Sequence, residues 1–184
     1  AEVRNLKSLT FATATDGNHG RAVAWTARRL GCPAVIYLPA NTTRARIEAV
    51  EDEGAEAVLV QGTYDDAVRL VACHSRERGW TLLQDTAWPG YGEMPTVIME
   101  GYTTLVAEAA SRMEGQSPTH VMVQTGVGSL ASAILSAVQE QWGDVRPHFT
   151  VVEPVKAAPF FLSSHGGDKK PKAAEGDLRT IMAG

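Results

Sequence analysis

Residues 9–38 read LTFATATDGNHGRAVAWTARRLGCPAVIYL, and this stretch decides the fold. Residues 9–13 are a short strand candidate rich in Thr and Phe, and the glycine-containing segment 16–20 cannot continue that strand. An apolar stripe with helical spacing predicts a helix over residues 21–30. The apolar run at 34–38 then predicts a buried strand, so the stretch is one strand–helix–strand unit.

The rest of the chain repeats this alternation. Helices are predicted to begin at Thr42 or Thr43, at Thr63, at Pro95 (a long helix to Met113) and at Leu130, and strands are predicted at residues 57–60, 80–84, 120–124 and 149–152. Strands separated by single helices need right-handed crossovers, and these strands read as continuous apolar runs. The sequence therefore predicts an α/β fold with mainly parallel open sheets and helices on both faces.

The bulk composition limits the classes of function. The 184 residues are 44% hydrophobic and 21% charged, which is ordinary for a soluble globular protein with one core, or one core and a smaller lobe. A net charge of −4 gives no basic face for nucleic acid, and the apolar stretches are too short for a membrane span. We therefore expect a cytoplasmic protein. We also expect the natural protein to extend in both directions, because each end lies in an amphipathic or apolar stretch.

The first candidate loop is residues 15–20, Thr-Asp-Gly-Asn-His-Gly. Ligands of open α/β sheets bind beyond the carboxyl ends of the strands, where this loop is predicted to lie. Asn18 has an amide that suits a ligand hydroxyl or oxyanion, although Asp16 or Asn18 would also serve as a helix cap. A cap needs only one such residue, and the concentration of Asp, Asn and His around two glycines favours a functional loop.

The second candidate loop is residues 124–130, Gln-Thr-Gly-Val-Gly-Ser-Leu, between a predicted strand and a predicted helix. Small residues allow the backbone to approach an anion, and the helix N-terminus attracts phosphate. Thr125 and Ser129 would add hydroxyl donors. A tight turn without a ligand is the alternative, and a short glycine pattern alone does not decide between them.

Two further strand ends carry polar residues. Asp85, followed by Thr86, Trp88 and Tyr91, is a candidate base or ammonium-binding group, or the start of an Asx turn with core aromatics. Glu153 follows the last strand and is interpreted as a loop acid satisfied locally. The histidines show no metal-ligand spacing, so no metal site is predicted.

The loop at 15–20 resembles the Ser-x-Gly-Asn-His-(Gly/Ala) loop of the fold-type II pyridoxal-phosphate (PLP) enzymes, the family that includes tryptophan synthase β and threonine dehydratase. By this resemblance the cofactor is PLP, and Asn18 hydrogen-bonds its ring hydroxyl. The phosphate is held by Gly126, Val127, Gly128, Ser129 and Leu130. Val127 and Ser129 depart from the family's glycines, but backbone donors would survive these changes.

Within the family, the diaminopropionate ammonia-lyases replace the serine of the loop with aspartate. Residues 11–20, 84–88 and 180–184 resemble that branch across essentially the whole chain. The resemblance implies conversion of 2,3-diaminopropionate, as either enantiomer, to pyruvate and ammonia. It implies that Asp16 is the base for the D-substrate and that Asp85 helps to bind or deprotonate the substrate. Thr15, Thr86 and Tyr91 are expected to contact the substrate.

The same resemblance implies a division of the chain into two lobes and the absence of the Schiff-base lysine from this sequence. Residues 14–92 are expected to form the smaller lobe, and residues 93–184 with 1–13 part of the larger, phosphate-binding lobe. The family is commonly homodimeric. Its Schiff-base lysine lies upstream of the asparagine loop, and Lys7 lacks the family's surrounding motif. We therefore expect this 184-residue chain alone to be inactive.

Three other functions are kept as alternatives. Serine or threonine dehydratase is the nearest catalytic neighbour, and Asp16 is the reason to prefer the diamino acid. A nicotinamide-dependent oxidoreductase would explain the Gly126-x-Gly128-x-x-Ala131 pattern with Glu153 as a ribose contact, but it leaves residues 16–19 unexplained. A non-catalytic fragment would explain the missing lysine.

Overall fold

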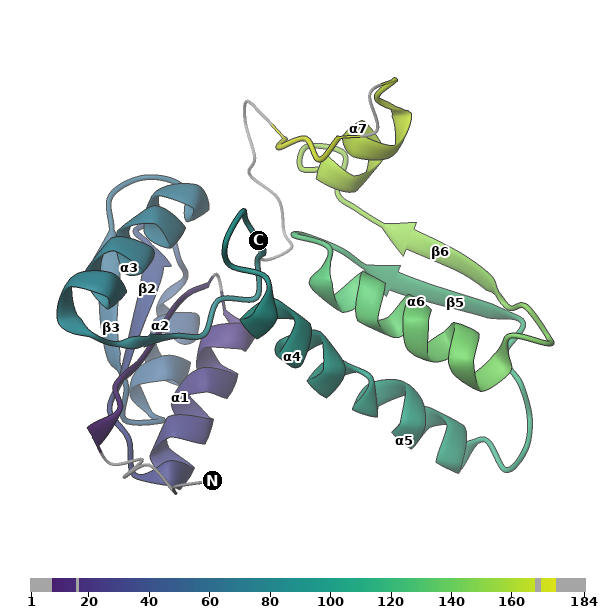
Figure 1. Cartoon of the computed structure of the whole chain (residues 1–184), viewed down its shortest axis with the longest axis horizontal. Helices are drawn as coiled ribbons and strands as arrows, with labels where there is room; N and C mark the ends of the chain where they lie inside the picture. Colours follow the sequence, from purple (N-terminus) through teal and green to yellow (C-terminus); the bar gives the residue numbers. More distant parts are fainter. Residues whose placement is uncertain (1–7, 16, 168–169, 175–184) are drawn as a thin grey trace. The chain divides into compact units, whose positions relative to one another are not determined.

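The structure is a computed structural model and describes residues 8–15, 17–167 and 170–174. The chain divides into two compact units, one reaching to Gln84 and the other starting at Asp85. Most of the elements of each unit are labelled in Figure 1.

The first unit is a four-stranded parallel sheet with the order β3-β2-β1-β4. Its elements follow the chain as β1 (Phe11–Ala14), α1 (Asn18–Leu30), β2 (Ala34–Pro39), α2 (Arg44–Glu51), β3 (Glu56–Val60), α3 (Tyr64–Arg78) and β4 (Thr81–Leu82). β1 therefore lies at the centre of the sheet, between β2 and β4. The predicted strand at 80–84 is shorter than expected, because the chain leaves the sheet after Leu82.

Both faces of this sheet are covered, as the sequence predicted. Phe11, Ile36 and Leu38 point to a core that they share with α1 and with Val50 of α2. The alternate residues of β1 and β2 point to a second core: Ala12, Ala14, Val35 and Tyr37. Val60 of β3 and Ala67 and Val71 of α3 complete this second core. Because successive side chains of a strand point to opposite faces, a strand that is apolar throughout needs cover on both faces.

The ends of the helices follow the signals in the sequence. Gly31 and Gly79 end α1 and α3 in the left-handed conformation, with φ of 70° and 68°, which glycine adopts without a Cβ penalty. Thr63 and Asp66 form a complete capping box at the start of α3. This pairing lowers the pKa of the Asp66 carboxyl to about 2, chiefly through the backbone hydrogen bond from Thr63.

The second unit pairs two parallel strands, β5 (His120–Gln124) and β6 (His148–Val152). Its helices are α4 (Glu93–Tyr102), α5 (Thr104–Arg112), α6 (Ser129–Trp142) and α7 (Pro159–His165). α6 packs against α4 and α5 and forms a core with β5, made of Val106, Val123, Ala131, Ile134, Ala137 and Val138. The helix predicted from Pro95 to Met113 is divided at Thr103. There the hydroxyls of Thr103 and Thr104 donate to main-chain carbonyls three residues earlier, a local competition that bends helices.

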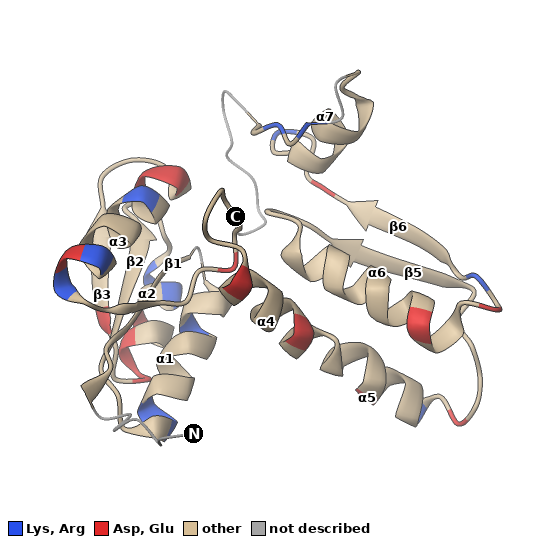
Figure 2. Cartoon of the chain, viewed as in Figure 1, with Lys and Arg blue, Asp and Glu red and all other residues tan. Residues whose placement is uncertain are grey.

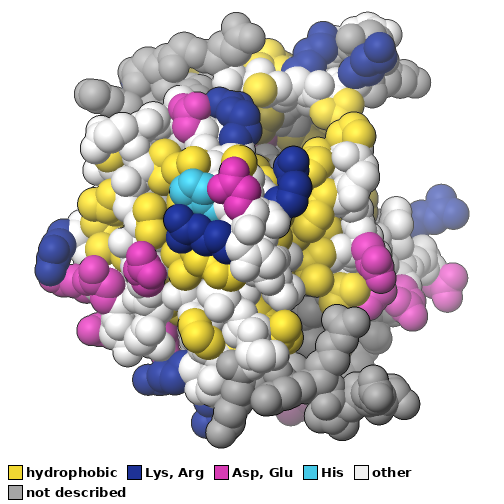
Figure 3. Space-filling view, turned by 60° about the vertical axis from the view of Figure 1, so that its left-hand side comes forward, with side chains coloured by type: hydrophobic (Ala, Val, Ile, Leu, Met, Phe, Trp, Pro, Cys, Tyr) yellow, Lys and Arg dark blue, Asp and Glu magenta, His cyan; other side chains and the backbone are white. Residues whose placement is uncertain are grey.

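Charges of both signs share the surface of the first unit (Figure 2). Arg21 and Arg28 of α1 approach the Glu53 carboxylate at 3.7 and 2.8 Å, which ties α1 to the segment after α2. Hydrophobic side chains are visible among these charges in Figure 3. Within the described ranges, no helix combines the length and the apolar character needed to cross a membrane.

Candidate active site

The loop after β1 is organised by Thr15. Its side chain is buried, and its Oγ1 accepts hydrogen bonds from the main-chain N–H groups of Gly17 (3.0 Å) and Gly20 (3.2 Å). Gly17 is the N-cap of α1 and has no side chain to cap it, but Thr15 Oγ1 satisfies the N–H of Gly20 in the first turn. Asn18, the first residue of α1, is exposed and does not cap the helix. Asp16 lies outside the described residues.

Gly20 is required by close packing. A Cβ at this position would lie 2.2 Å from Thr15 Cγ2 and 2.7 Å from Ile36 Cγ2, both on buried residues. The neighbouring His19 brings its Nε2 to 2.7 Å from the carbonyl oxygen of Leu83. Because a carbonyl oxygen only accepts, the Nε2 of His19 carries the proton in this contact. The loop is therefore fastened to the strand end at Leu83 as well as to its own Thr15.

The second loop connects β5 to α6. Gly128 is the N-cap of α6 and has a φ of 97°, a conformation that favours glycine. Among the residues that the structure describes, no side-chain hydrogen bond caps the N-terminus of α6, and its first turn contains no acidic residue. Within the described part of the chain, the buried Oγ1 of Thr125 has no hydrogen-bond partner. Open main-chain donors beside an unsatisfied hydroxyl suit an anion such as phosphate.

Asp85 and Ser129 are brought together, although they lie 44 residues apart in the sequence. The hydroxyl of Ser129 donates to the main-chain carbonyl oxygen of Asp85, which fastens the start of the second unit to the N-terminus of α6. Tyr102 of α4 lies close enough for the Asp85 carboxylate to act on it. Burial, with a smaller contribution from Asp85, raises the pKa of the Tyr102 phenol to about 12.

The segment after Asp85 forms a tight turn. Trp88 and Tyr91 exchange two main-chain hydrogen bonds, and Gly90 between them has a φ of 87°. Their rings stack with centroids 4.3 Å apart and planes inclined by 16°. Both aromatics are half-buried, as is Thr86. This turn fixes the backbone of the predicted substrate residue Tyr91, whereas Thr86 lies before it.

Glu153 serves a structural purpose. Its two carboxylate oxygens accept the main-chain N–H groups of Phe160 and Phe161 at the start of α7, each at 2.8 Å. This agrees with the interpretation of Glu153 as a locally satisfied acid. Both oxygens of the ribose contact that the oxidoreductase alternative requires are thus engaged at the start of α7.

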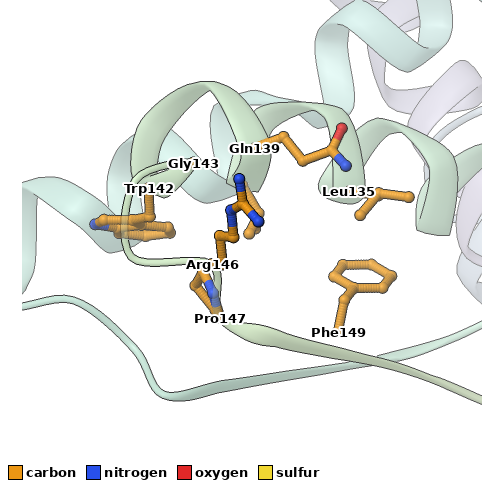
Figure 4. Close-up of a pocket in the computed structure, with 8 residues that line it drawn as sticks. Leu135, Gln139, Trp142, Gly143, Arg146, Pro147 and Phe149 are labelled. Atoms are coloured by element: carbon orange, nitrogen blue, oxygen red, sulfur yellow. The ribbon is translucent and has the colours of Figure 1, made fainter.

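Two of the hollows formed by the described residues lie in the second unit. The larger, of about 1010 Å³, reaches Gly128 and Ala131 of α6 and is lined mainly by apolar residues of β6 and α7. The smaller, of about 330 Å³, lies at the other end of α6, where Trp142 and Arg146 border it (Figure 4). The smaller hollow contains none of the predicted site residues. Among the described residues, no three His, Cys, Asp or Glu side chains could hold a metal ion.

Sequence reasoning missed two residues beside these loops. Gln84, directly before Asp85, is fully buried and accepts from the main-chain N–H of Ala14. Tyr102 lies within the helix predicted from Pro95 to Met113 and was not singled out as a site residue. A polar residue inside an apolar strand was the available signal for Gln84, whereas Tyr102 gives no local signal.

The donors of the second loop suit PLP. The main-chain N–H groups in the first turn of α6 and the hydroxyl of Thr125 are suitable donors for the phosphate of PLP. The amide of Asn18 is suitable for a hydrogen bond to the ring hydroxyl of PLP. Asn18 is a candidate cofactor-binding residue of the first unit, and Thr125 with the start of α6 is a candidate phosphate site of the second unit.

Comparisons with known proteins agree with this chemistry. The chain is 45% identical over 180 residues to diaminopropionate ammonia-lyase of Escherichia coli K12, covering 97% of this chain and 45% of the relative. The crystal structure of the E. coli enzyme in complex with D-serine matches 95% of this chain and 46% of its own, at 42% identity and a TM-score of 0.86. L-serine dehydratase/L-threonine deaminase of Rattus norvegicus is 33% identical over 71% of this chain and 34% of its own length.

The chain thus spans less than half the length of the ammonia-lyases that it matches. The sequence family described as pyridoxal-phosphate dependent enzymes matches it throughout, over residues 1–184. The solved structures similar to it also include a threonine deaminase of Solanum lycopersicum, at 26% identity and a TM-score of 0.70. The chain belongs to the family of pyridoxal-phosphate-dependent enzymes, with the fold-type II architecture.

Proposed function

We propose that the full-length gene product is an ammonia-lyase that converts 2,3-diaminopropionate to pyruvate and ammonia. The observation that carries the proposal is the 45% identity to the E. coli enzyme across 97% of this chain. The Asp-Gly-Asn-His-Gly loop at 16–20 supports the same branch of the family.

Bound PLP would supply the electron sink that acidifies Cα of an amino-acid substrate. We assign its phosphate to Gly126, Val127, Gly128, Ser129 and Leu130, with Thr125 adding a hydroxyl. This assignment is supported by the uncapped first turn of α6 and the unsatisfied Thr125 Oγ1. We assign the ring hydroxyl to the exposed amide of Asn18.

Asp16 and Asp85 are the proposed bases. One base approaches one face of a reacting Cα, so acceptance of both enantiomers requires a second base. We assign Asp16 as the base for the D-substrate, with Asp85 helping to bind or deprotonate the substrate. Thr15, Thr86 and Tyr91 are proposed to contact the substrate. The hydrogen bond from Ser129 to the Asp85 carbonyl supports this arrangement, since it links a proposed base to the proposed phosphate loop.

Pyruvate release from D- and L-2,3-diaminopropionate by the full-length protein with added PLP tests the proposal. Release from both enantiomers is expected, with only the D-activity lost in Asp16→Asn. Asp144→Asn, in an exposed turn, is the matched control and should retain both activities. Absence of release from either enantiomer would contradict the proposed reaction.

Serine or threonine dehydratase is the second candidate, because the rat dehydratase is 33% identical over 71% of this chain. Turnover of L-serine or L-threonine without turnover of either diaminopropionate enantiomer would favour it. The same assay therefore decides between the two reactions.

The family resemblance also supports proposals about the whole protein. We propose a cytoplasmic homodimer with a smaller lobe at residues 14–92, and with 93–184 and 1–13 in the larger lobe. Light scattering on the purified gene product tests the dimer, and cell fractionation tests the location. An active preparation of residues 1–184 alone would contradict the expected dependence on a lysine outside this sequence.

A further inference from the structure

The carboxyl end of β1 is completed by a side chain. In a parallel pair, main-chain hydrogen bonds alternate evenly between the strands. The N–H of Thr81 donates to Thr10 and that of Leu83 donates to Ala12, so the next bond of this ladder would join the N–H of Ala14 to the carbonyl of Leu83. The structure departs from the ladder at this point.

Two side chains take the place of the missing bond. The N–H of Ala14 donates to Oε1 of Gln84 at 2.9 Å, and the carbonyl of Leu83 instead receives Nε2 of His19 at 2.7 Å. The Gln84 amide thus replaces one backbone acceptor, while His19 uses the carbonyl that the departure leaves open. The first contact holds Ala14, directly before the loop that begins at Thr15, and the second holds His19 within that loop.

The orientation of the Gln84 amide is fixed on both sides. Its oxygen also accepts from Oγ1 of Thr13 at 3.1 Å, and its Nε2 donates to the hydroxyl of Tyr64 at 2.8 Å. Gln84 is fully buried, so a lost partner is not replaced by water. A residue kept only for packing would need none of these bonds.

We propose that Gln84 is a positioning residue that fixes the strand end leading into residues 15–20. Ala14 lies two positions before Asp16, whereas Asp85 has a separate anchor in the hydroxyl of Ser129. Loss of the Gln84 acceptor therefore loosens the Asp16 loop more than it loosens Asp85. This assignment rests on the proposed roles of Asp16 and Asp85, but the structural part can be tested without them.

The structural test is hydrogen exchange on the full-length protein. Gln84→Met keeps the length of the side chain and removes the acceptor. Exchange of peptide 11–20 is expected to accelerate at least tenfold, while peptide 34–39, which holds β2, remains unchanged. Thr13→Val is the matched control, since it removes a buried hydroxyl on Gln84 without removing the acceptor of Ala14. Equal exchange of peptide 11–20 in Gln84→Met and the wild type would overturn the proposal.

The functional test is the ratio of D- to L-diaminopropionate turnover. Gln84→Met is expected to lower kcat for the D-enantiomer at least tenfold more than kcat for the L-enantiomer. A parallel fall in both activities would indicate a general structural defect and contradict the positioning role. If the wild type turns over neither enantiomer, the proposed function fails, and the exchange test still decides the role of Gln84.

A measurement on the unmodified protein applies if Gln84→Met does not fold. The amide of Ala14 lies beyond the last main-chain bond to β4, so its protection reports the Gln84 bond. Protection comparable to that of Ala12 is expected. Exchange of Ala14 at the rate of an open loop amide would refute the bond.

Discussion

Gly20→Ala tests how tightly the asparagine loop is built. The added Cβ would lie 2.2 Å from Thr15 Cγ2 and 2.7 Å from Ile36 Cγ2, closer than carbon atoms can approach. Thr15 and Ile36 are both buried and branched at Cβ, so neither can turn away easily. Overpacking of this kind costs about 1–3 kcal/mol, and two such contacts place this site near the upper end.

Two further effects change the expected loss of stability in Gly20→Ala. Alanine is a better helix former than glycine by about 1 kcal/mol, which offsets part of the cost. Displacement of Thr15 weakens the two hydrogen bonds that its Oγ1 accepts, each worth about 1 kcal/mol. We therefore expect a net destabilisation of about 2–4 kcal/mol, a sum in which the clash outweighs the gain in propensity.

Thermal unfolding of the full-length protein, followed by circular dichroism, measures this effect. A loss of 2 kcal/mol lowers the midpoint by about 4–8 °C in a domain of 150–250 residues. Gly101→Ala in α4 is the matched control, because a Cβ there meets no atom within 4 Å. The control should be neutral or slightly stabilised. An unchanged midpoint in Gly20→Ala would show that the loop adjusts to the Cβ, and the packing argument would be wrong.

Three other predictions concern the second unit. Ser129→Ala removes the bond to the Asp85 carbonyl, worth about 1 kcal/mol, and should weaken PLP binding about fivefold in an absorbance titration. Ser132→Ala on the same helix should leave the affinity unchanged. Glu153→Ala removes both carboxylate acceptors at α7 and should accelerate hydrogen exchange of residues 159–165 at least tenfold, unlike Glu140→Ala. The pKa of Tyr102 is raised to about 12, so its folded form keeps the proton while the unfolded form loses it near pH 10. Stability should fall as pH rises from about 10 to 12, and less so in Tyr102→Phe, as measured by urea unfolding.

Local patterns in the sequence predicted the local structure. Gly31, Gly79 and the Thr63–Asp66 pair act within a few residues of their own helices, so such signals can be read from the local sequence. The alternating cores of the first unit follow from strands that are apolar on both faces. The division of the long helix at Thr103 was missed, because apolar periodicity does not register hydroxyls that compete for main-chain carbonyls.

The contacts that organise the site are not local. Ser129 and Asp85 are 44 residues apart, and Gln84 and Ala14 are 70 residues apart. No periodicity or turn rule relates such positions, so sequence reasoning found the loops without finding what holds them. Glu153 shows the opposite case. Its polar position after a strand drew attention, and its carboxylate proves to be a helix cap.

Each unit carries a buried threonine where a strand passes into its loop. The main-chain N–H of Thr15 donates to Tyr37 on the neighbouring strand, and that of Thr125 donates to Val152. The two hydroxyls differ, since Thr15 Oγ1 accepts two N–H groups of its own loop and Thr125 Oγ1 has no partner in the described residues. A buried hydroxyl without a partner costs about 1–3 kcal/mol, and a bound phosphate oxygen would remove that cost. The hydroxyl of Thr15 is therefore satisfied by its own chain, whereas the proposed phosphate loop would gain stability from a phosphate bound at Thr125.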